Sequence, residues 1–268
     1  MSSLIVRKIN GLLKTRDMGK VIHYFDEVES TNDVLKGLAE KGASEGTAVI
    51  AESQTKGKGR LDRSWISPGG TNLYISVLLR PHVAAVTAPI FTLLTSVALR
   101  EAISKTGVED PFIKWPNDIQ INSKKVAGIL TEMSTNNEKV NFVIVGIGVN
   151  INMSRNQMNS EFGSVSGIAA SIQDSLGKEI DRAKFTSDLL LELETWYGMF
   201  KKRGRKHILS AWEGMWGGKD KAVKVSSVDG SSYEGIARGI NEEGHLLVQT
   251  TEGEIKSVIA GDVTQLRE

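Results

Sequence analysis

The chain lacks several residue types that particular kinds of function require. It has 268 residues and no cysteine, which excludes a disulfide framework, a thiolate nucleophile and cysteine-based metal sites. Its four histidines, His23, His82, His207 and His245, show no i, i+4 spacing, so a zinc site is not expected. The absence of cysteine suits a reducing compartment, and we expect a cytoplasmic protein.

The chain also has little excess charge and no signal for insertion into a membrane. Its 33 basic and 32 acidic residues leave a net charge of +1, so any electrostatic function must be local rather than a property of the whole molecule. The first 20 residues interrupt short apolar runs with Arg and Lys, unlike a signal peptide. We expect no membrane-spanning segment.

The hydrophobic pattern predicts a main domain followed by a small one. Strand and helix patterns alternate up to about Trp216, and the run VNFVIVGIGVNIN is typical of a central strand covered on both faces. The glycines of GMWGGKD indicate a boundary. Beyond it, short alternating runs separated by DGSS, NEEG and TEGE predict a small β-barrel. We expect an α+β fold, with a mixed, mainly antiparallel sheet packed against helices.

One short stretch concentrates positive charge on a flexible backbone. KGKGRLDRSW (56–65) contains two glycines, four cations and a terminal tryptophan. Gly57 and Gly59 permit backbone conformations in which consecutive amides converge on an anion, so a phosphate or carboxylate is the expected ligand. Trp65 offers a flat face to a ring or base. The same composition also fits a solvated surface loop, and it matches neither a P-loop nor a dinucleotide-binding motif.

A second motif, KWPND (114–118), can place polar groups at a strand end. Pro116 fixes a turn that projects Asn117 and Asp118, where a carboxylate can help hold Mg²⁺ or accept a proton. Proline, asparagine and aspartate are also ordinary turn residues, so the motif alone leaves both interpretations open.

Glycine and lysine mark two further strands. Lys125 precedes an apolar strand that contains Gly128, although a single lysine there is more often solvated than catalytic. VGIGVNIN places Gly146 and Gly148 in a buried strand, where missing side chains allow a ligand or another backbone to approach closely.

The order and spacing of these elements resemble those of the biotin protein ligases, the biotin–[acetyl-CoA-carboxylase] ligase group. The matching segments are ESTND, QTKGKGRLDRSWISPGGTNLYISVLLRP, KWPNDI, KKVAGILTE, VGIGVNIN and ARGINEEGHLLVQTTEGEIKS. The resemblance implies an N-terminal segment (1–21), a catalytic domain (22–216) and a C-terminal SH3-like domain (217–268). It also implies ATP-dependent formation of biotinyl-5′-adenylate and transfer of the biotinyl group to a lysine of a biotin carboxyl carrier protein.

The resemblance assigns roles to individual residues. The residues expected to bind biotin are Ser30, Thr31, Asn32, Gln54, Lys58, Gly59, Arg60, Lys125, Gly128 and Gly146. Those expected to bind ATP or the adenylate are Arg60, Arg63, Trp65, Asn117, Lys125 and Asn150. The expected catalytic residues are Lys125, Arg60 and Asp118, and those expected to help place Mg²⁺ are Asn117 and Asp118. ATP with Mg²⁺ and biotin are the implied substrates, without a tightly bound prosthetic group.

The chain departs from the family pattern at two places. The loop of relatives more often reads G-R-G-R, whereas Lys58 holds the first cationic position here. Lysine lacks the bidentate fork of arginine, so we expect this position to contact biotin through its backbone. Many relatives also carry a winged helix-turn-helix domain before the catalytic domain, whereas only residues 1–21 precede it here. We therefore expect no specific DNA binding and no repressor role. Relatives often form dimers through the edges of their sheets, so a homodimer is possible here as well.

Two alternatives compete with this interpretation. Lipoate ligases and octanoyl transferases resemble the same catalytic fold, but GKGRLDRSW, KWPND and the small C-terminal domain together favour biotin. A nucleic-acid or regulatory binding module could use the basic loop as its contact. The near-zero net charge and the absence of a recognisable nucleic-acid reading motif count against that alternative.

Overall fold

A seven-stranded sheet organises the larger part of the chain. The computed structural model describes residues 4–226 and 230–266. The strands of this sheet are β1 (Ile22–Val28), β2 (Ala48–Gln54), β3 (Leu73–Leu79), β4 (Phe112–Lys114), β5 (Asp118–Ile121), β6 (Lys124–Asn136) and β7 (Lys139–Val149). Their order is β1-β2-β3-β7-β6-β5-β4, and only β1 and β2 pair in parallel. The expected α+β fold with a mixed, mainly antiparallel sheet is confirmed, and the apolar run at β7 forms the central strand.

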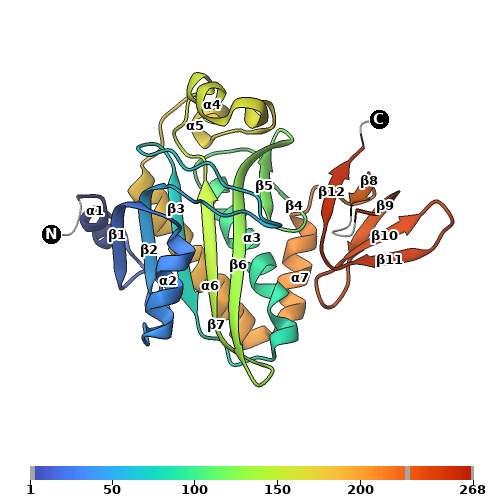
Figure 1. Ribbon diagram of the computed structural model, residues 1–268, viewed down its shortest axis with the longest axis horizontal. Helices are drawn as coiled ribbons and strands as arrows, with labels where there is room; N and C mark the ends of the chain where they lie inside the picture. The colour runs from blue at the N-terminus through green and yellow to red at the C-terminus, as the bar shows by residue number, and fades with distance from the viewer. Residues whose placement is uncertain (1–3, 227–229, 267–268) are drawn as a thin grey trace.

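Helices cover both faces of this sheet (Figure 1). The α-helices are α1 (Leu4–Leu12), α2 (Thr31–Glu40), α3 (Pro89–Ser104), α4 (Arg155–Phe162), α5 (Ile172–Leu176), α6 (Arg182–Arg203) and α7 (Arg205–Gly214), and the 3₁₀ turns are η1 (Ala85–Thr87) and η2 (Gly163–Ile168). Helices α3, α6 and α7 pack together behind the sheet, and α2 packs on the opposite face, against β2, β3 and β7.

The two-residue period of β7 divides the core between these faces. Val143, Val145 and Ile147 join the large cluster under α3 and α6. Ile144 points to the opposite face and packs with Leu35 of α2. Side chains at even-numbered positions of β7 therefore face α2, as alternation along a strand requires.

Among the described residues, one helical stretch is long and apolar enough by composition to cross a membrane, namely Ala85–Ser104. Length and composition are the only features that this stretch shares with a membrane span, so the expectation of no membrane-spanning segment stays a prediction. In the fold, 67% of the most apolar part of this stretch is buried, because α3 packs against α6, α7 and the sheet. The stretch is apolar on nearly all sides because protein surrounds it.

The C-terminal part forms a second, five-stranded antiparallel sheet (Figure 1). Its strands are β8 (Ala222–Ser226), β9 (Ser232–Ile240), β10 (Leu246–Thr250), β11 (Ile255–Val258) and β12 (Asp262–Gln265), in the order β11-β10-β9-β8-β12. The antiparallel sheet agrees with the sequence pattern, although that pattern did not reveal β12. Within the described residues β11 and β12 are the two ends of the sheet, so closure into an SH3-like barrel is not confirmed. The boundaries 1–21, 22–216 and 217–268 remain predictions.

A tight contact holds the C-terminal sheet beside α3 and the 114–118 turn. The indole N–H of Trp115 donates to the carbonyl of Gly244, at 3.2 Å, in the turn between β9 and β10. Gly244 has a φ of +85°, and a Cβ at this position would lie 2.7 Å from a methyl carbon of Leu93. Glycine is therefore needed for both the backbone conformation and the close approach.

A partly buried carboxylate fixes the segment that leads into β1. Glu194 of α6 accepts hydrogen bonds from the backbone amides of Arg16, Asp17 and Met18, at 2.7, 2.6 and 2.9 Å. Burial alone would raise the pKa of Glu194, but the three amide bonds outweigh this effect and hold the pKa below its ordinary value. The ionised form is thus favoured by folding.

We predict that Glu194→Gln lowers the free energy of unfolding at pH 7 by about 1–3 kcal/mol, because the neutral amide replaces a charged acceptor. The depressed pKa makes this contribution complete above the ordinary value of 4.5 and progressively lost as the pH falls below it. Urea unfolding at pH 7 and pH 3.5 should therefore show the difference between wild type and variant shrinking at the lower pH. An equal difference at both values would contradict the role given to the ionised carboxylate.

Candidate active site

The site lies on the α2 face of the sheet, where strand side chains are missing. Gly146 and Gly148 of β7 occupy even-numbered positions, and Gly128 of β6 pairs with Gly148. A Cβ on Gly146 would lie 2.2 Å from Oδ1 of Asn32, and one on Gly148 would lie 2.5 Å from Nε1 of Trp65. The glycines thus open a hollow that an amide and an indole enter, as missing side chains in a strand allow.

The N-terminus of α2 supplies polar groups to one end of this hollow. Ser30 occupies the N-cap position without a capping hydrogen bond from its side chain. The Ser76 hydroxyl lies 2.7 Å from Oγ1 of Thr31 and 2.6 Å from Oδ1 of Asn32. Gln54 accepts from the Thr31 amide at 2.9 Å. Ser30, Thr31 and Asn32, expected with Gln54 to pair with a ureido ring, are therefore buried, and Gln54 is partly buried beside them.

The loop between β2 and β3 folds back on itself. The amide of Trp65 donates to the carbonyl of Gly57 at 2.8 Å, and the amide of Gly59 donates to the carbonyl of Arg63 at 2.6 Å. A Cβ on Gly57 would lie only 2.3 Å from the Trp65 carbonyl oxygen. Gly57 is therefore required by the close approach of the two arms. The Gly59 amide is used within the loop, so it does not contribute to the expected convergence of amides on an anion.

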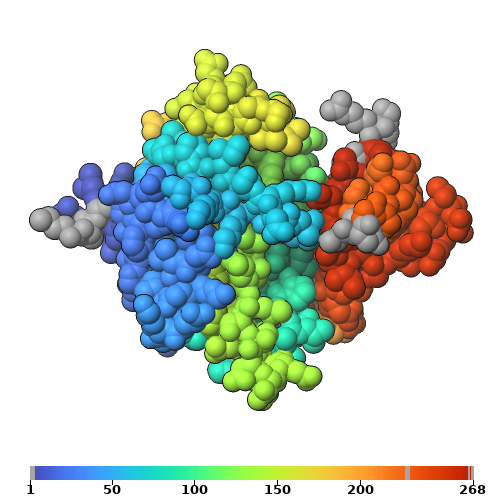
Figure 2. Space-filling model, viewed as in Figure 1, coloured from blue at the N-terminus to red at the C-terminus, as the bar shows by residue number. Residues whose placement is uncertain are grey.

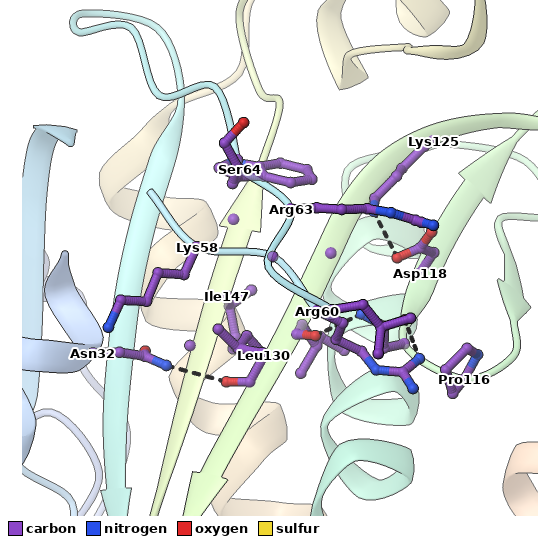
Figure 3. A pocket seen from close by; sticks show the side chains of 18 of the residues that line it. Asn32, Lys58, Arg60, Arg63, Ser64, Pro116, Asp118, Lys125, Leu130 and Ile147 are labelled. Carbon is purple, nitrogen blue, oxygen red and sulfur yellow. Dashed lines mark hydrogen bonds and ion pairs between the residues drawn. The ribbon is translucent and has the colours of Figure 1, made fainter. Parts of the chain in front are cut away.

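The loop cations point to different partners. The Lys58 ammonium lies 2.5 Å from a carboxylate oxygen of Asp33, and Arg63 forms a bidentate pair with Asp262. In Figure 3, Lys58 extends toward Asn32 and away from Arg63. Arg63 therefore faces a carboxylate of β12 in this structure, in addition to lining the cavity where a phosphate was expected.

Arg60 differs from the other loop cations. Its guanidinium is half-buried, and its closest hydrogen-bond partner is the amide oxygen of Asn117, at 3.4 Å. Burial lowers the pKa of Arg60, and the negative charges of Asp118 and Asp262 partly offset this. With an ordinary value of 12.5, the group remains a cation at neutral pH. Arg60 is thus a desolvated positive charge directed into the site.

Lys125 and Asp118 form an ion pair at the opposite side of the hollow (Figure 3). The Lys125 ammonium lies 2.8 Å from a carboxylate oxygen of Asp118, with the side chains 33% and 17% exposed. The same ammonium is 5.1 Å from the ring centroid of Trp65, a cation–π distance. Lys125 is therefore held in place rather than fully solvated, contrary to the common behaviour of an isolated lysine.

The structure brings together nearly all of the residues that the sequence analysis singled out. The following line one cavity: Ser30, Thr31, Asn32, Gln54, Lys58, Gly59, Arg60, Arg63, Trp65, Asn117, Asp118, Lys125, Gly128 and Gly146. Asn150 does not line it. Its amide N–H₂ donates to the carbonyl of Ala170 at 3.0 Å and its backbone N–H donates to the carbonyl of Val126 at 2.9 Å. Contact between Asn150 and the adenylate stays a prediction.

The sequence analysis did not identify several residues that form or support the site. Ser76 is a polar residue inside the buried apolar strand LYISVLL, and this local signal could have identified it. Glu132 accepts from the Asn32 amide at 2.5 Å and ends an apolar stretch of β6. Asp262 lines the cavity from the second sheet, and no local pattern could reveal it because only the tertiary fold brings β12 to the loop.

Comparisons with known proteins agree with this geometry. The sequence model of the biotin/lipoate A/B protein ligase family matches residues 24–150, and that of the biotin protein ligase C-terminal domain matches residues 220–264. The bifunctional ligase/repressor BirA of Bacillus subtilis is 39% identical over 251 residues, which cover 94% of this chain and 76% of that protein. The chain therefore belongs to the biotin protein ligase family. As a member, it is an enzyme of the biotin ligase class.

Two further relatives support membership of the biotin protein ligases. The biotin–[acetyl-CoA-carboxylase] ligase of Paracoccus denitrificans is 31% identical over 84% of this chain and 92% of its own length. The structure of the Aquifex aeolicus biotin protein ligase in complex with biotin and ATP superposes with a TM-score of 0.76, at 31% identity, over 93% of this chain and all of that chain.

We predict that Gly146→Ala lowers the free energy of unfolding by about 1–3 kcal/mol, because the new methyl group displaces the Asn32 amide and breaks its buried hydrogen bonds. The matched control is Gly37→Ala in α2, where a Cβ meets nothing within 4 Å. That change should instead leave stability unchanged or raise it by about 0.5–1 kcal/mol. Urea unfolding compares the two variants, and a Gly146→Ala protein as stable as wild type would show that Asn32 does not need the space.

Proposed function

We propose that the chain activates biotin with ATP to biotinyl-5′-adenylate and transfers the biotinyl group to a lysine of a biotin carboxyl carrier protein. The observation that carries the proposal is the convergence of Lys125 and Arg60 on one cavity. The polar N-terminus of α2 forms its other end. Such a cavity suits a polar ring at one end and two anions brought together at the other.

The first step needs positive charge because two anions must meet. A carboxylate oxygen of biotin attacks the α-phosphorus of ATP, a new oxygen–phosphorus bond forms, and the bond to pyrophosphate breaks. Negative charge builds on the phosphoryl oxygens, where preorganised cations in a desolvated site stabilise it. Lys125, held by Asp118 and Trp65, and half-buried Arg60 are suited to this role.

The second step needs a neutral amine. The carrier lysine attacks the carbonyl carbon of the adenylate, an amide bond forms, and AMP leaves. The attacking nitrogen must lose a proton, and the Asp118 carboxylate at the cavity wall is the group proposed to receive it. Because Asp118 also pairs with Lys125, the same carboxylate would orient the cation for the first step and accept a proton in the second.

The residues expected to place Mg²⁺ do not form a metal site by themselves. The Asn117 amide oxygen faces Arg60 and one Asp118 oxygen faces Lys125. Among the described residues no group of three or more His, Asp or Glu side chains could hold a metal ion. We propose that Mg²⁺ arrives as part of the MgATP substrate, bound through phosphate oxygens and water, and placement of the ion by Asn117 and Asp118 stays a prediction. A repressor role is not part of the proposal, and its absence stays a prediction from the sequence.

We predict biotin-dependent exchange of labelled pyrophosphate into ATP, with no exchange when lipoate or octanoate replaces biotin. Lys125→Ala should reduce this exchange at least about 10²-fold, because a cation that stabilises the transition state is removed. Lys124→Ala removes the neighbouring cation, which does not line the cavity, and should leave exchange within about twofold of wild type. Exchange with lipoate instead of biotin would favour a lipoate ligase. If none of the three acids supported exchange, adenylate formation would be refuted.

We also predict that Asp118→Asn slows transfer from preformed enzyme–adenylate to the carrier by about 10²-fold, because the amide cannot accept the proton. A single-turnover assay with isolated adenylate complex measures this step apart from activation. Asp220→Asn, a change of the same kind in the turn before β8, should not alter the rate. A transfer rate unchanged by Asp118→Asn would exclude this carboxylate as the proton acceptor.

A further inference from the structure

The four cations of the 56–63 segment do not share one role. Lys56, Lys58 and Arg63 each form an ion pair with a carboxylate outside the loop, whereas Arg60 pairs with none among the described residues. A loop built only to gather positive charge for substrate anions would not place carboxylates from elsewhere against three of its four cations. The partners of the outer cations therefore call for a separate explanation.

The first of these contacts joins the loop to α2. Lys58 lies 2.5 Å from Asp33, and the two side chains are 41% and 45% exposed. The hydrogen bond to Asp33 raises the pKa of Lys58. Asp33 follows Thr31 and Asn32 directly, so this contact ties the loop to the helix end that carries the polar residues of the cavity. A lysine suffices here because a single carboxylate oxygen is contacted, which needs no guanidinium fork.

The second contact joins the loop to the C-terminal sheet. Arg63 donates to both carboxylate oxygens of Asp262, one of them at 2.9 Å. In Figure 2 the light-blue loop crosses the front of the molecule and meets the red C-terminal part. The Arg63 hydrogen bond holds the pKa of Asp262 below its ordinary value. Asp262 lies at the start of β12 and also lines the cavity, so the second sheet closes one side of the site.

Arg60 lies between these two contacts. The turn from Gly59 to Arg63 is closed by backbone hydrogen bonds, so fixing Lys58 on one side and Arg63 on the other also fixes where Arg60 points. In Figure 3 its side chain lies near Pro116, with Lys58 directed away on the far side. The two outer cations thus constrain the loop, and the half-buried one faces the cavity.

We propose that Asp33 and Asp262 are positioning residues that clasp this loop over the cavity from α2 and from the C-terminal sheet. Each clasp is one ion pair: Lys58 of the loop pairs with Asp33, and Arg63 of the loop pairs with Asp262. Arg60 is the loop cation that contacts the substrate anion. The kinetic part of this proposal rests on the proposed ligase function, and the clasp itself does not.

Both ion pairs are exposed, so their contribution to loop closure must be modest and sensitive to salt. Exposed pairs of this kind shift an equilibrium by about two- to fivefold each. For a loop that opens and closes, such a shift changes how often its backbone is accessible, and this is measurable without any substrate.

Limited trypsin digestion of the full chain, without biotin or ATP, tests the clasps directly. Asp33→Asn and Asp262→Asn keep every trypsin site in the loop, so a faster cut among Lys58, Arg60 and Arg63 reports loop opening. At low salt each variant should be cut about two- to fivefold faster than wild type, and the double variant faster still. At 0.5 M salt the differences should disappear. Cutting rates equal to wild type at low salt would overturn the proposal.

Asp220→Asn is the matched control, since it removes a 2.7 Å ion pair between the turn before β8 and Arg238 of β9 that does not touch the loop. Its cutting rate should equal that of wild type at both salt concentrations. An equally large effect of Asp220→Asn would mean that loss of any carboxylate in the C-terminal part loosens the loop, which would refute a specific clasp.

Kinetics separate positioning from a purely structural role. Asp262→Asn should raise KM for ATP about two- to fivefold with kcat nearly unchanged, because only the closed population falls. Arg63→Asp and Asp262→Arg should each impair the enzyme singly, and the double exchange should restore KM. Failure of the exchanged pair to restore it would refute a direct clasp. If wild type shows no biotin-dependent exchange at all, the ligase function fails while the trypsin result still decides the clasp.

Discussion

The absence of three side chains on one face of the sheet is the constraint on which the site depends. Gly128, Gly146 and Gly148 leave the α2 face of β6 and β7 bare beyond the point where α2 itself covers it. Packed interiors do not leave such space empty, so other groups enter it. Asn32 comes from the end of α2 and Trp65 from the loop after β2. Because the backbone of two strands forms the floor, the groups above it are held by the most rigid part of the fold.

Charge in the site is arranged so that each cation has a distinct environment. Lys125 is paired with Asp118 and lies on the Trp65 ring, whereas Arg60 is half-buried and its guanidinium donates to the amide oxygen of Asn117. The exposed cations at either side of Arg60 meet carboxylates from outside the loop. This distribution explains how a chain with a net charge of only +1 can concentrate positive charge at one place. The carboxylates that pair with these cations offset part of their positive charge and also restrict where their side chains lie.

The second sheet contributes to the site as well as to the architecture. The Trp115–Gly244 hydrogen bond sets the β9–β10 turn beside the 114–118 segment, and Asp262 reaches the loop from the same sheet. Both contacts join residues more than a hundred positions apart. Correct docking of the C-terminal sheet is therefore required for the cavity wall of this chain to be complete, even though the residues nearest the proposed chemistry belong to the seven-stranded part.

The sequence by itself determined the class of the fold and the central strand through its hydrophobic pattern, and glycines in a buried strand and cations beside glycine marked part of the cavity. Ser30, Thr31, Asn32 and Gln54 followed only from the resemblance to the biotin protein ligases. The sequence did not reveal β12 or the partners of Lys58 and Arg63. Only the tertiary structure decided these, because a side chain's partner depends on elements distant in the chain. The sequence shows where a cationic residue stands in the chain, but the fold determines which carboxylate it pairs with.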